Sequence, residues 1–242
     1  MKSIVVKDYN EMSAKATEIM YDVISQKPNC VLGLATGSTP EGLYANLIEL
    51  YRNGKLDFSG VSSVNLDEYY PIAPDNDQSY RYFMNTHLFD HVNIDKANTF
   101  VPDGLASDPE AACKAHEDKI DELGGMDIQV LGIGQNGHIG FNEPSDTPVP
   151  FTHMENLTES TIKANARFFE SESDVPTRAL TMGIQSILKA RKIIILASGK
   201  SKAEAIKATL MGEPTPHCPA SLLHSHPDVT VICDEEAYSL CK

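Results

Sequence analysis

The chain has 242 residues, which is enough for one large domain with a substantial apolar core. Its formal net charge of −14 disfavours nucleic acid and anionic membrane surfaces as partners, because an acidic protein repels both. It contains no apolar run of about 18 residues that predicts a membrane span, and no N-terminal signal core. The five cysteines are scattered, without a Cys-x-x-Cys pair, so we expect free thiols and a cytoplasmic protein.

Short apolar runs alternate with amphipathic segments along the chain. In chain order, we expect strands at 4–6, 30–35, 61–66, 127–133, 193–197 and 229–233, and helices at 10–27, 40–52, 77–89, 108–123 and 201–211. This alternation predicts an α/β fold: one catalytic domain over 1–242, with a mostly parallel, twisted, Rossmann-like sheet and helices on both faces. Residues 144–176 are less regular, and we expect them to form a mobile active-site lid.

A turn directly before the helix expected at 40–52 contains glycine and hydroxyl side chains. Gly37, Ser38 and Thr39 would place N–H groups and hydroxyls at a helix N-terminus, which favours phosphate binding. An ordinary helix cap by Ser38 or Thr39, with Pro40 in the first turn, explains the same residues equally well. The sequence leaves both interpretations open.

Two carboxylates follow the strand expected at 61–66, in what reads as a polar turn. Neighbouring residues of an extended chain point to opposite sides, so only one of the two can face a pocket. Asp67 is the candidate base, and Glu68 would point elsewhere. Solvated loop acids or a helix cap are the commoner explanation for such a pair taken alone.

The glycine-rich stretch at 132–144 carries the strongest chemical signal. Asn136, His138 and Glu143 lie among its glycines, just beyond the strand expected at 127–133. A histidine can move a proton near neutral pH, and a nearby carboxylate can orient it. The alternative is a structural histidine that caps the turn. Because the carboxyl ends of parallel strands share one edge of a sheet, we expect this loop to lie near the other two turns.

Basic side chains that could bind a phosphate occur at two places. Arg167 lies in the expected lid, and Lys200 and Lys202 follow the strand at 193–197. Any of them could equally be a solvated surface residue. His224 and His226 lie close together, but their spacing matches no familiar metal-binding pattern, so we expect no metal site.

Several of these stretches resemble the glucosamine-6-phosphate deaminase family. The resemblance extends over nearly the whole chain and is carried by residues 32–40, 65–69, 132–144, 165–169, 179–184 and 201–203. It implies conversion of glucosamine 6-phosphate and water to fructose 6-phosphate and ammonia, in amino-sugar catabolism. It also implies a small sugar phosphate as the partner, and no organic cofactor or metal.

The resemblance further implies roles for individual residues. Asp67 would move a proton between C2 and C1 of the sugar, His138 would assist opening of the pyranose ring, and Glu143 would orient His138. The phosphate would be held by Gly37, Ser38, Thr39, Arg167 and Lys202. Many family members carry Asp where this chain has Asn136, so His138 faces one negative neighbour fewer here.

Two other functions remain as alternatives. A 6-phosphogluconolactonase-type hydrolase shares the turn at 37–40, but that family usually has Arg where Tyr69 stands and Gly-His-Thr-Ala-Ser where this chain has 137–141. A non-catalytic sugar-phosphate sensor of a regulator would need a DNA-binding module, for which a first strand at residue 4 leaves no room. Longer family members form hexamers through a C-terminal extension that we do not see here, so we expect a monomer or a small homo-oligomer.

Overall fold

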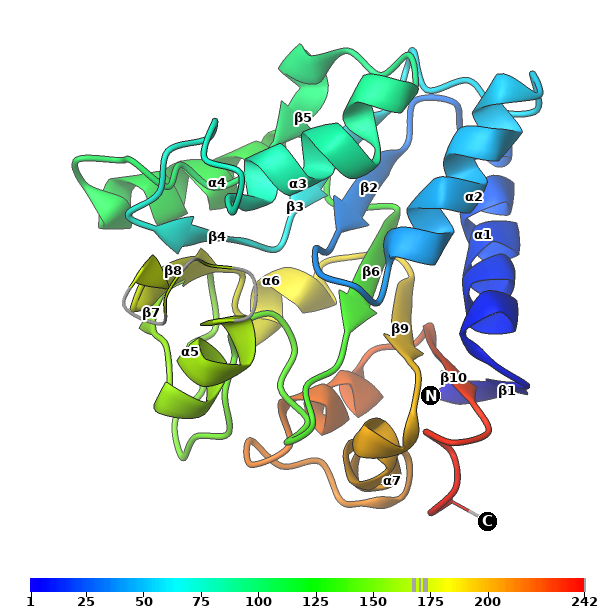
Figure 1. The fold of residues 1–242 in the computed structure, drawn as a ribbon, viewed down its shortest axis with the longest axis vertical. Coiled ribbons are helices and arrows are strands. Elements are labelled where there is room, and N and C mark those ends of the chain that lie inside the picture. The colour runs from blue at the N-terminus through cyan, green and yellow to red at the C-terminus, as the bar shows by residue number, and fades with distance from the viewer. Residues whose placement is uncertain (167–168, 170, 172–173, 242) are drawn as a thin grey trace.

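The computed structural model describes residues 1–166, 169, 171 and 174–241 (Figure 1). Within them, seven parallel strands form one sheet in the order β1-β10-β9-β6-β2-β3-β5. These strands are β1 (Lys2–Val6), β2 (Val31–Leu34), β3 (Ser62–Asn65), β5 (Thr99–Phe100), β6 (Ile128–Gly132), β9 (Ile193–Ala197) and β10 (Val229–Asp234). The predicted α/β fold with a mostly parallel sheet is confirmed.

Helices cover both faces of this sheet. One face packs against α1 (Tyr9–Gln26), α2 (Glu41–Arg52) and α3 (Tyr80–His87). The other packs against α4 (Pro109–Glu122), α6 (Ile184–Leu188), α7 (Ala203–Met211) and the 3-10 helix η6 (Pro219–Ser225). The interior strand β9 has Ile193 and Ile195 in one core and Ile194 in the other, which explains its unbroken apolar run.

A second, antiparallel sheet was not predicted. It has the order β4-β8-β7, formed by β4 (Asp67–Tyr70), β8 (Arg178–Thr181) and β7 (His153–Asn156). The polar turn expected after residue 66 is therefore wrong, because Asp67 begins a strand. All three strands have only four residues, and their polar side chains lack the apolar run by which the other strands were recognised.

A single residue links the two sheets. Leu66 N donates a hydrogen bond of 3.0 Å to Leu34 O at the end of β2, and Leu66 O accepts one of 2.8 Å from Met182 N, which follows β8. The chain thus passes directly from the parallel sheet into the antiparallel one, and Asp67 is the first residue beyond the junction.

The segment 144–176 begins with a loop and contains β7 and the short helix α5 (Glu159–Asn165). Helix α5 begins after Thr158, whose side chain accepts a hydrogen bond from Thr161 N. The mobility of this segment stays a prediction. Three single-turn 3-10 helices complete the described elements: η1 (Phe89–His91), η2 (Lys96–Asn98) and η5 (Lys200–Lys202).

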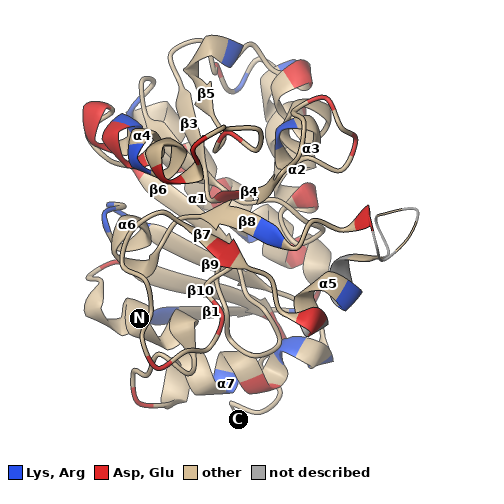
Figure 2. Cartoon of the chain, turned by 90° about the vertical axis from the view of Figure 1, so that its left-hand side faces the viewer, with Lys and Arg blue, Asp and Glu red and all other residues tan. Residues whose placement is uncertain are grey.

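Charged side chains of both signs occur together on the helices, as Figure 2 shows for α4. On that helix, Lys114 lies 2.5 Å from Asp118, and Lys119 pairs with Glu122. Such exposed pairs add little stability, since water and salt screen them. Among the helices of the described ranges, none combines the length and the apolar character needed to cross a membrane.

Candidate active site

The loop after β6 reverses its direction at glycines. Gly134 N donates to His138 O at 2.9 Å, and Gly137 N donates to Gly134 O at 3.0 Å. Gly137 and Gly140 have φ angles of +86° and +57°, a region that residues with a Cβ rarely occupy. In this histidine loop (residues 134–143), Gly137 and Gly140 are therefore required by the backbone.

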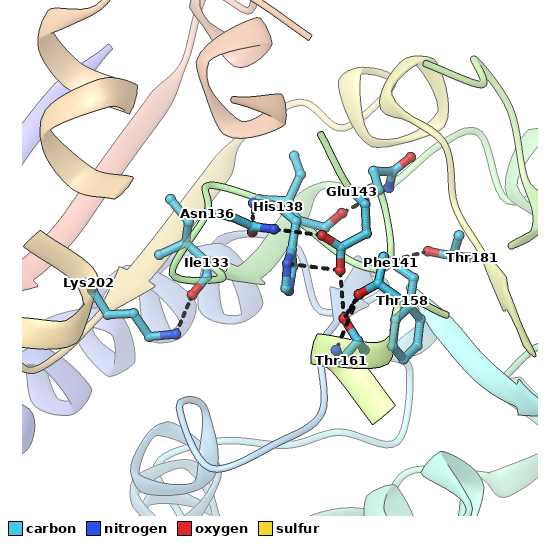
Figure 3. A network of polar contacts seen from close by, with 11 residues as sticks. Ile133, Asn136, His138, Phe141, Glu143, Thr158, Thr161, Thr181 and Lys202 are labelled. Atoms are coloured by element: carbon cyan, nitrogen blue, oxygen red, sulfur yellow. Dashed lines mark hydrogen bonds and ion pairs between the residues drawn. The ribbon is translucent and has the colours of Figure 1, made fainter. Parts of the chain in front are cut away.

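Gly134 has a second role, because the imidazole of His138 lies against it. A Cβ added at Gly134 would lie 2.3–2.6 Å from three atoms of the His138 ring, closer than any real contact. The ring therefore occupies the space where a side chain at residue 134 would stand. On its other side, His138 Nδ1 lies 3.4 Å from Glu143 Oε1, an ion-pair distance (Figure 3).

Glu143 is held from several sides. Asn136 Nδ2 donates to its Oε2, and Thr161 Oγ1 donates to its Oε1, both at 2.6 Å. Burial alone would raise the pKa of Glu143, but the contacts with His138, Thr161 and Asn136 lower it to about 2. A carboxylate ionised at neutral pH beside Nδ1 favours the tautomer that carries its proton on Nδ1. Nε2 is then the ring nitrogen left to exchange a proton.

Asp67 lies against this histidine loop. It pairs with Thr181 in the antiparallel sheet, and Thr181 Oγ1 accepts a hydrogen bond of 3.1 Å from Phe141 N of the loop. A Cβ built on Gly140 would lie 3.6 Å from Asp67 Oδ2. The structure therefore brings the predicted carboxylate and the histidine loop together, although they come from different sheets.

The environment of Asp67 suits a strong base. Its side chain is buried, and no residue of the described ranges donates a hydrogen bond to its carboxylate. Burial, and next the negative charge of Glu68, raise the pKa of Asp67 to about 8. Once deprotonated, this carboxylate has a high proton affinity and little solvation, which favours proton abstraction from a weakly acidic C–H bond.

Glu68 points away from Asp67, as expected for neighbours on one strand. Its carboxylate accepts hydrogen bonds from the backbone N–H groups of Tyr69, Tyr80 and Arg81, at 2.8–2.9 Å. Burial raises the pKa of Glu68 to about 7, while these hydrogen bonds act in the opposite direction. Glu68 thus anchors the start of α3 and has a structural role.

The predicted helix cap at Ser38 or Thr39 is wrong. Helix α2 begins at Glu41, Pro40 occupies the capping position, and no side chain caps the helix there. Instead, the Tyr9 hydroxyl from α1 accepts a hydrogen bond from Gly42 N and donates one to Ser38 O, both at 2.9 Å. The turn has Gly37 at φ +88°. In the described structure, the side-chain hydroxyls of Ser38 and Thr39 do not cap the helix.

The phosphate candidates gather beside the end of β6. A Cβ at Gly132 would lie 3.9 Å from Thr39 Oγ1, and Lys202 Nζ donates a hydrogen bond of 2.7 Å to Ile133 O (Figure 3). Thr39 and Lys202 therefore flank two consecutive residues of one strand end. Arg167, the third candidate, lies outside the described residues.

Three polar residues that support the site were missed from the sequence. Asp234, at the end of β10, accepts hydrogen bonds from Ser198 Oγ at 2.5 Å and Gly199 N at 2.9 Å, and so fixes the turn that leads to Lys202. Thr161 and Thr181 contact the histidine loop. A polar residue at the end of a predicted parallel strand could have identified Asp234, whereas both threonines belong to elements without a sequence signal.

The two histidines near the C-terminus bond to the backbone. His224 Nε2 lies 2.7 Å from Thr209 O, and His226 Nε2 lies 2.6 Å from Ala190 O. In the part of the chain that the structure describes, no group of three or more His, Cys, Asp or Glu side chains could hold a metal.

A cavity of about 550 Å³ lies apart from the chemistry. It is lined by residues of the loop at 148–150, of α6 and of η6, and none of the candidate site residues lines it. Its walls are mainly proline and aliphatic side chains. We therefore place the candidate site by its functional groups and not by this cavity.

Comparison with known proteins agrees with this geometry. The family model "Glucosamine-6-phosphate isomerases/6-phosphogluconolactonase" matches residues 9–232. The chain belongs to this family. Within the glucosamine-6-phosphate isomerase/6-phosphogluconolactonase family, it is 59% identical to the glucosamine-6-phosphate deaminase of Clostridium beijerinckii, over 100% of both chains. It is 55% identical to that of Thermoanaerobacter pseudethanolicus, over 99% of this chain and 95% of the relative.

Solved structures distinguish the two branches of the glucosamine-6-phosphate isomerase/6-phosphogluconolactonase family. A monomeric glucosamine-6-phosphate deaminase superposes with a TM-score of 0.97 at 49% identity, covering 99% of this chain and 100% of its own. The 6-phosphogluconolactonase of Trypanosoma brucei superposes with a TM-score of 0.75 at 18% identity, covering 98% of this chain and 97% of its own. The second likeness extends to the fold alone.

Proposed function

We propose that this protein is a glucosamine-6-phosphate deaminase, which converts glucosamine 6-phosphate and water to fructose 6-phosphate and ammonia. The observation that carries the proposal is the position of a buried carboxylate, Asp67, beside the loop whose histidine, His138, is paired with the carboxylate of Glu143. The high identity to deaminases over the full chain supports the same reaction.

The substrate's phosphate would be bound first, at the turn of Gly37, Ser38 and Thr39. Lys202 adds a positive charge beside it, and Arg167 is proposed as a second cation. A phosphate held in this way supplies binding energy far from the reacting carbons, and that energy fixes the sugar against Asp67 and His138.

His138 would then open the pyranose ring. Its Nε2 accepts the proton of the O1 hydroxyl and returns a proton to the ring oxygen as the C1–O5 bond breaks, which yields the open-chain aldehyde. Glu143 stabilises the imidazolium formed between the two transfers, and Asn136 keeps Glu143 in place through its 2.6 Å hydrogen bond.

Asp67 would carry out the isomerisation. Its carboxylate removes the proton from C2, and the electron pair forms a C1–C2 double bond as the carbonyl oxygen gains, in net terms, the proton that the substrate's ammonium group loses. Return of the proton to C1 gives the C2 imine, and water then replaces nitrogen to leave the ketone and ammonia. The substrate's ammonium group favours the ionised form of Asp67, which offsets its raised pKa.

Three further features belong to the proposal. Residues 144–176 act as a lid that brings Arg167 to the phosphate and excludes water from the intermediate. The protein is a monomer or a small homo-oligomer, consistent with the monomeric relative. Its five free, buried cysteines fit a reducing compartment such as the cytoplasm.

One assay separates the main alternatives. The purified protein is given glucosamine 6-phosphate, with ammonia release measured, and in parallel 6-phosphogluconolactone, with acid release measured. We expect ammonia release and no lactone hydrolysis above the spontaneous rate. Lactone hydrolysis alone would establish the hydrolase, and binding of glucosamine 6-phosphate without turnover would establish a sensor.

A further inference from the structure

Helix α5 reaches the proton-transfer groups through one side chain. Thr161 is buried, and its Oγ1 donates a hydrogen bond of 2.6 Å to Glu143 Oε1, the same oxygen that lies 3.4 Å from His138 Nδ1 (Figure 3). The Thr161 hydroxyl and the His138 ring therefore approach a single carboxylate oxygen. This residue belongs to the segment 144–176, far in sequence from β6.

The protons that Glu143 and Thr161 carry decide which group donates and which accepts in their hydrogen bonds. Glu143 is ionised at neutral pH and can only accept, so the single hydroxyl proton of Thr161 points to Glu143. Thr161 Oγ1 must then accept from Thr158 Oγ1, which lies 3.0 Å away, while Thr158 Oγ1 accepts from Thr161 N. The hydroxyl proton of Thr161 thus has one orientation, towards Glu143.

The helix that carries Thr161 is itself held against the site. Its residue Ile162 packs in an apolar cluster with Tyr69 of β4 and Phe141 of the histidine loop. Further along the segment, the Phe169 ring lies 5.8 Å from that of Tyr69, in a T-shaped contact. In this arrangement, these contacts hold α5 against β4 and the histidine loop, and the Thr161 hydroxyl lies within hydrogen-bond distance of Glu143.

On the basis of the proposed function, we infer that Thr161 is a positioning residue for proton transfer: its hydroxyl fixes Glu143 so that the carboxylate orients His138. The consequence is that ring opening depends on the placement of α5. A shift of α5 would release Glu143 Oε1 and let the carboxylate rotate about the Asn136 hydrogen bond. Phosphate binding, in contrast, is proposed to use the turn of Gly37, Ser38 and Thr39, with which Thr161 makes no hydrogen bond in the described structure.

The test compares Thr161→Val, which keeps the shape and removes the hydroxyl, with Thr161→Ser, which keeps the hydroxyl. We expect Thr161→Val to lower kcat by about 10- to 100-fold, because it removes a hydrogen bond to a charged group. KM should change by less than about threefold, because the phosphate contacts remain. Thr161→Ser should retain most of kcat. A matched control is Thr86→Val, since that hydroxyl bonds within its own helix, α3, and kcat should not change.

A readout without substrate separates this inference from the proposed function. In ligand-free protein, the pKa of the Glu143 carboxyl is measured from the pH dependence of its 13C chemical shift. This pKa should rise from about 2 towards its ordinary value in Thr161→Val and not in Thr161→Ser. If the wild-type protein releases no ammonia, the deaminase proposal is wrong. The titration of Glu143 would still test the contact with Thr161, because it needs no substrate.

Two outcomes would overturn the role of Thr161. One is a Thr161→Val variant with wild-type kcat and an unchanged Glu143 titration. The other is a Thr161→Ser variant as slow as Thr161→Val, which would show that the methyl group and not the hydroxyl matters. Thermal unfolding of both variants is measured as well, so that a loss of kcat caused by a displaced α5 can be recognised.

Discussion

At the scale of single residues, the ionised form of Asp67, the proposed base, is unfavourable in the folded state. Burial raises the pKa of Asp67 to about 8, so its contribution to stability is greatest below its unfolded pKa of about 3.9 and is lost as the pH rises towards 8. Catalysis needs the ionised form, which is the form that burial disfavours. Stability and activity therefore make opposite demands on this side chain.

The variant Asp67→Asn should separate these demands. We expect turnover to fall by about 10²–10⁴-fold, while affinity for the phosphate substrate is retained. At pH 8 its melting temperature should exceed that of the wild type, and near pH 3, where wild-type Asp67 is protonated in both states, the difference should vanish. Kinetics, substrate titration and thermal melts at both pH values check this; retained turnover would remove Asp67 from the mechanism.

A second residue-scale prediction concerns Asn136. Its Nδ2 donates to Glu143 at 2.6 Å, and Asn136→Asp would replace a donor with a second carboxylate at that distance. The repulsion should raise the pKa of Glu143 from about 2, so the acid limb of the kcat profile should move to higher pH. The pH–rate profiles of both proteins are compared. A profile that does not move would show that the charge at this position has no effect on the histidine.

At the scale of elements, the histidine loop depends on the absence of a side chain at Gly134. In Gly134→Ala, the new Cβ would overlap the His138 ring, which must leave its position. Since Gly134 has no positive φ, we expect the backbone to tolerate alanine, and the loss should appear mainly in kcat. Kinetics and thermal unfolding are measured together; a fully active variant would mean that the ring position is not required.

The parallel strands were predictable because of their burial. Strands such as β9, covered by helices on both sides, must be apolar at every position, and that leaves a continuous signal in the sequence. β4 carries Asp67 and Glu68, and the sequence therefore predicts a turn there, although the strand pairs with β8 over four residues. Here tertiary pairing and not local preference decides the structure.

The same contrast applies to the candidate site. Asp67, Asn136, His138 and Glu143 could be selected because glycines and a strand end mark them, and the structure gathers them at one edge. Thr161 could not, since a threonine in an irregular polar segment has no pattern that distinguishes it. Its contact with Glu143 exists only because α5 folds back over the loop.

At the scale of the whole molecule, acid should destabilise the fold through a buried histidine. His116 of α4 donates from Nε2 to Asn65 O at 3.0 Å, and burial lowers its pKa to about 4. Its neutral form is kept in the folded state, so stability is complete above the unfolded pKa of about 6.5 and is lost as the pH falls towards 4.

The substitution His116→Gln should remove this loss, because an amide can still donate to Asn65 O but does not titrate. In urea unfolding at pH 7.0, 5.5 and 4.5, the loss of stability between pH 7.0 and 4.5 should be about 2 kcal/mol greater in the wild type than in the variant. Asp67 and Glu143 titrate in both proteins and cancel in the difference. If the free energy of unfolding declines equally in both proteins, groups other than His116 cause the acid sensitivity.

Assembly is a separate question at this scale. By analogy with the monomeric relative, we expect sedimentation at micromolar concentration to give a monomer or a small oligomer. The substrate dependence of the rate should then be hyperbolic, since cooperativity requires coupled sites. A hexamer with a sigmoidal response would contradict both expectations.

The position of Leu66 has a consequence for how such an enzyme can diversify. Its N–H group is hydrogen-bonded to β2 of the large sheet and its carbonyl group to Met182, directly after β8 of the small sheet, and Asp67, the proposed base, is the next residue. The position of Asp67 therefore depends both on the packed parallel sheet and on the three short strands of the antiparallel sheet. Substitutions in β7 or β8 can therefore shift the Asp67 carboxylate by a fraction of an ångström without any change in the core of the large sheet.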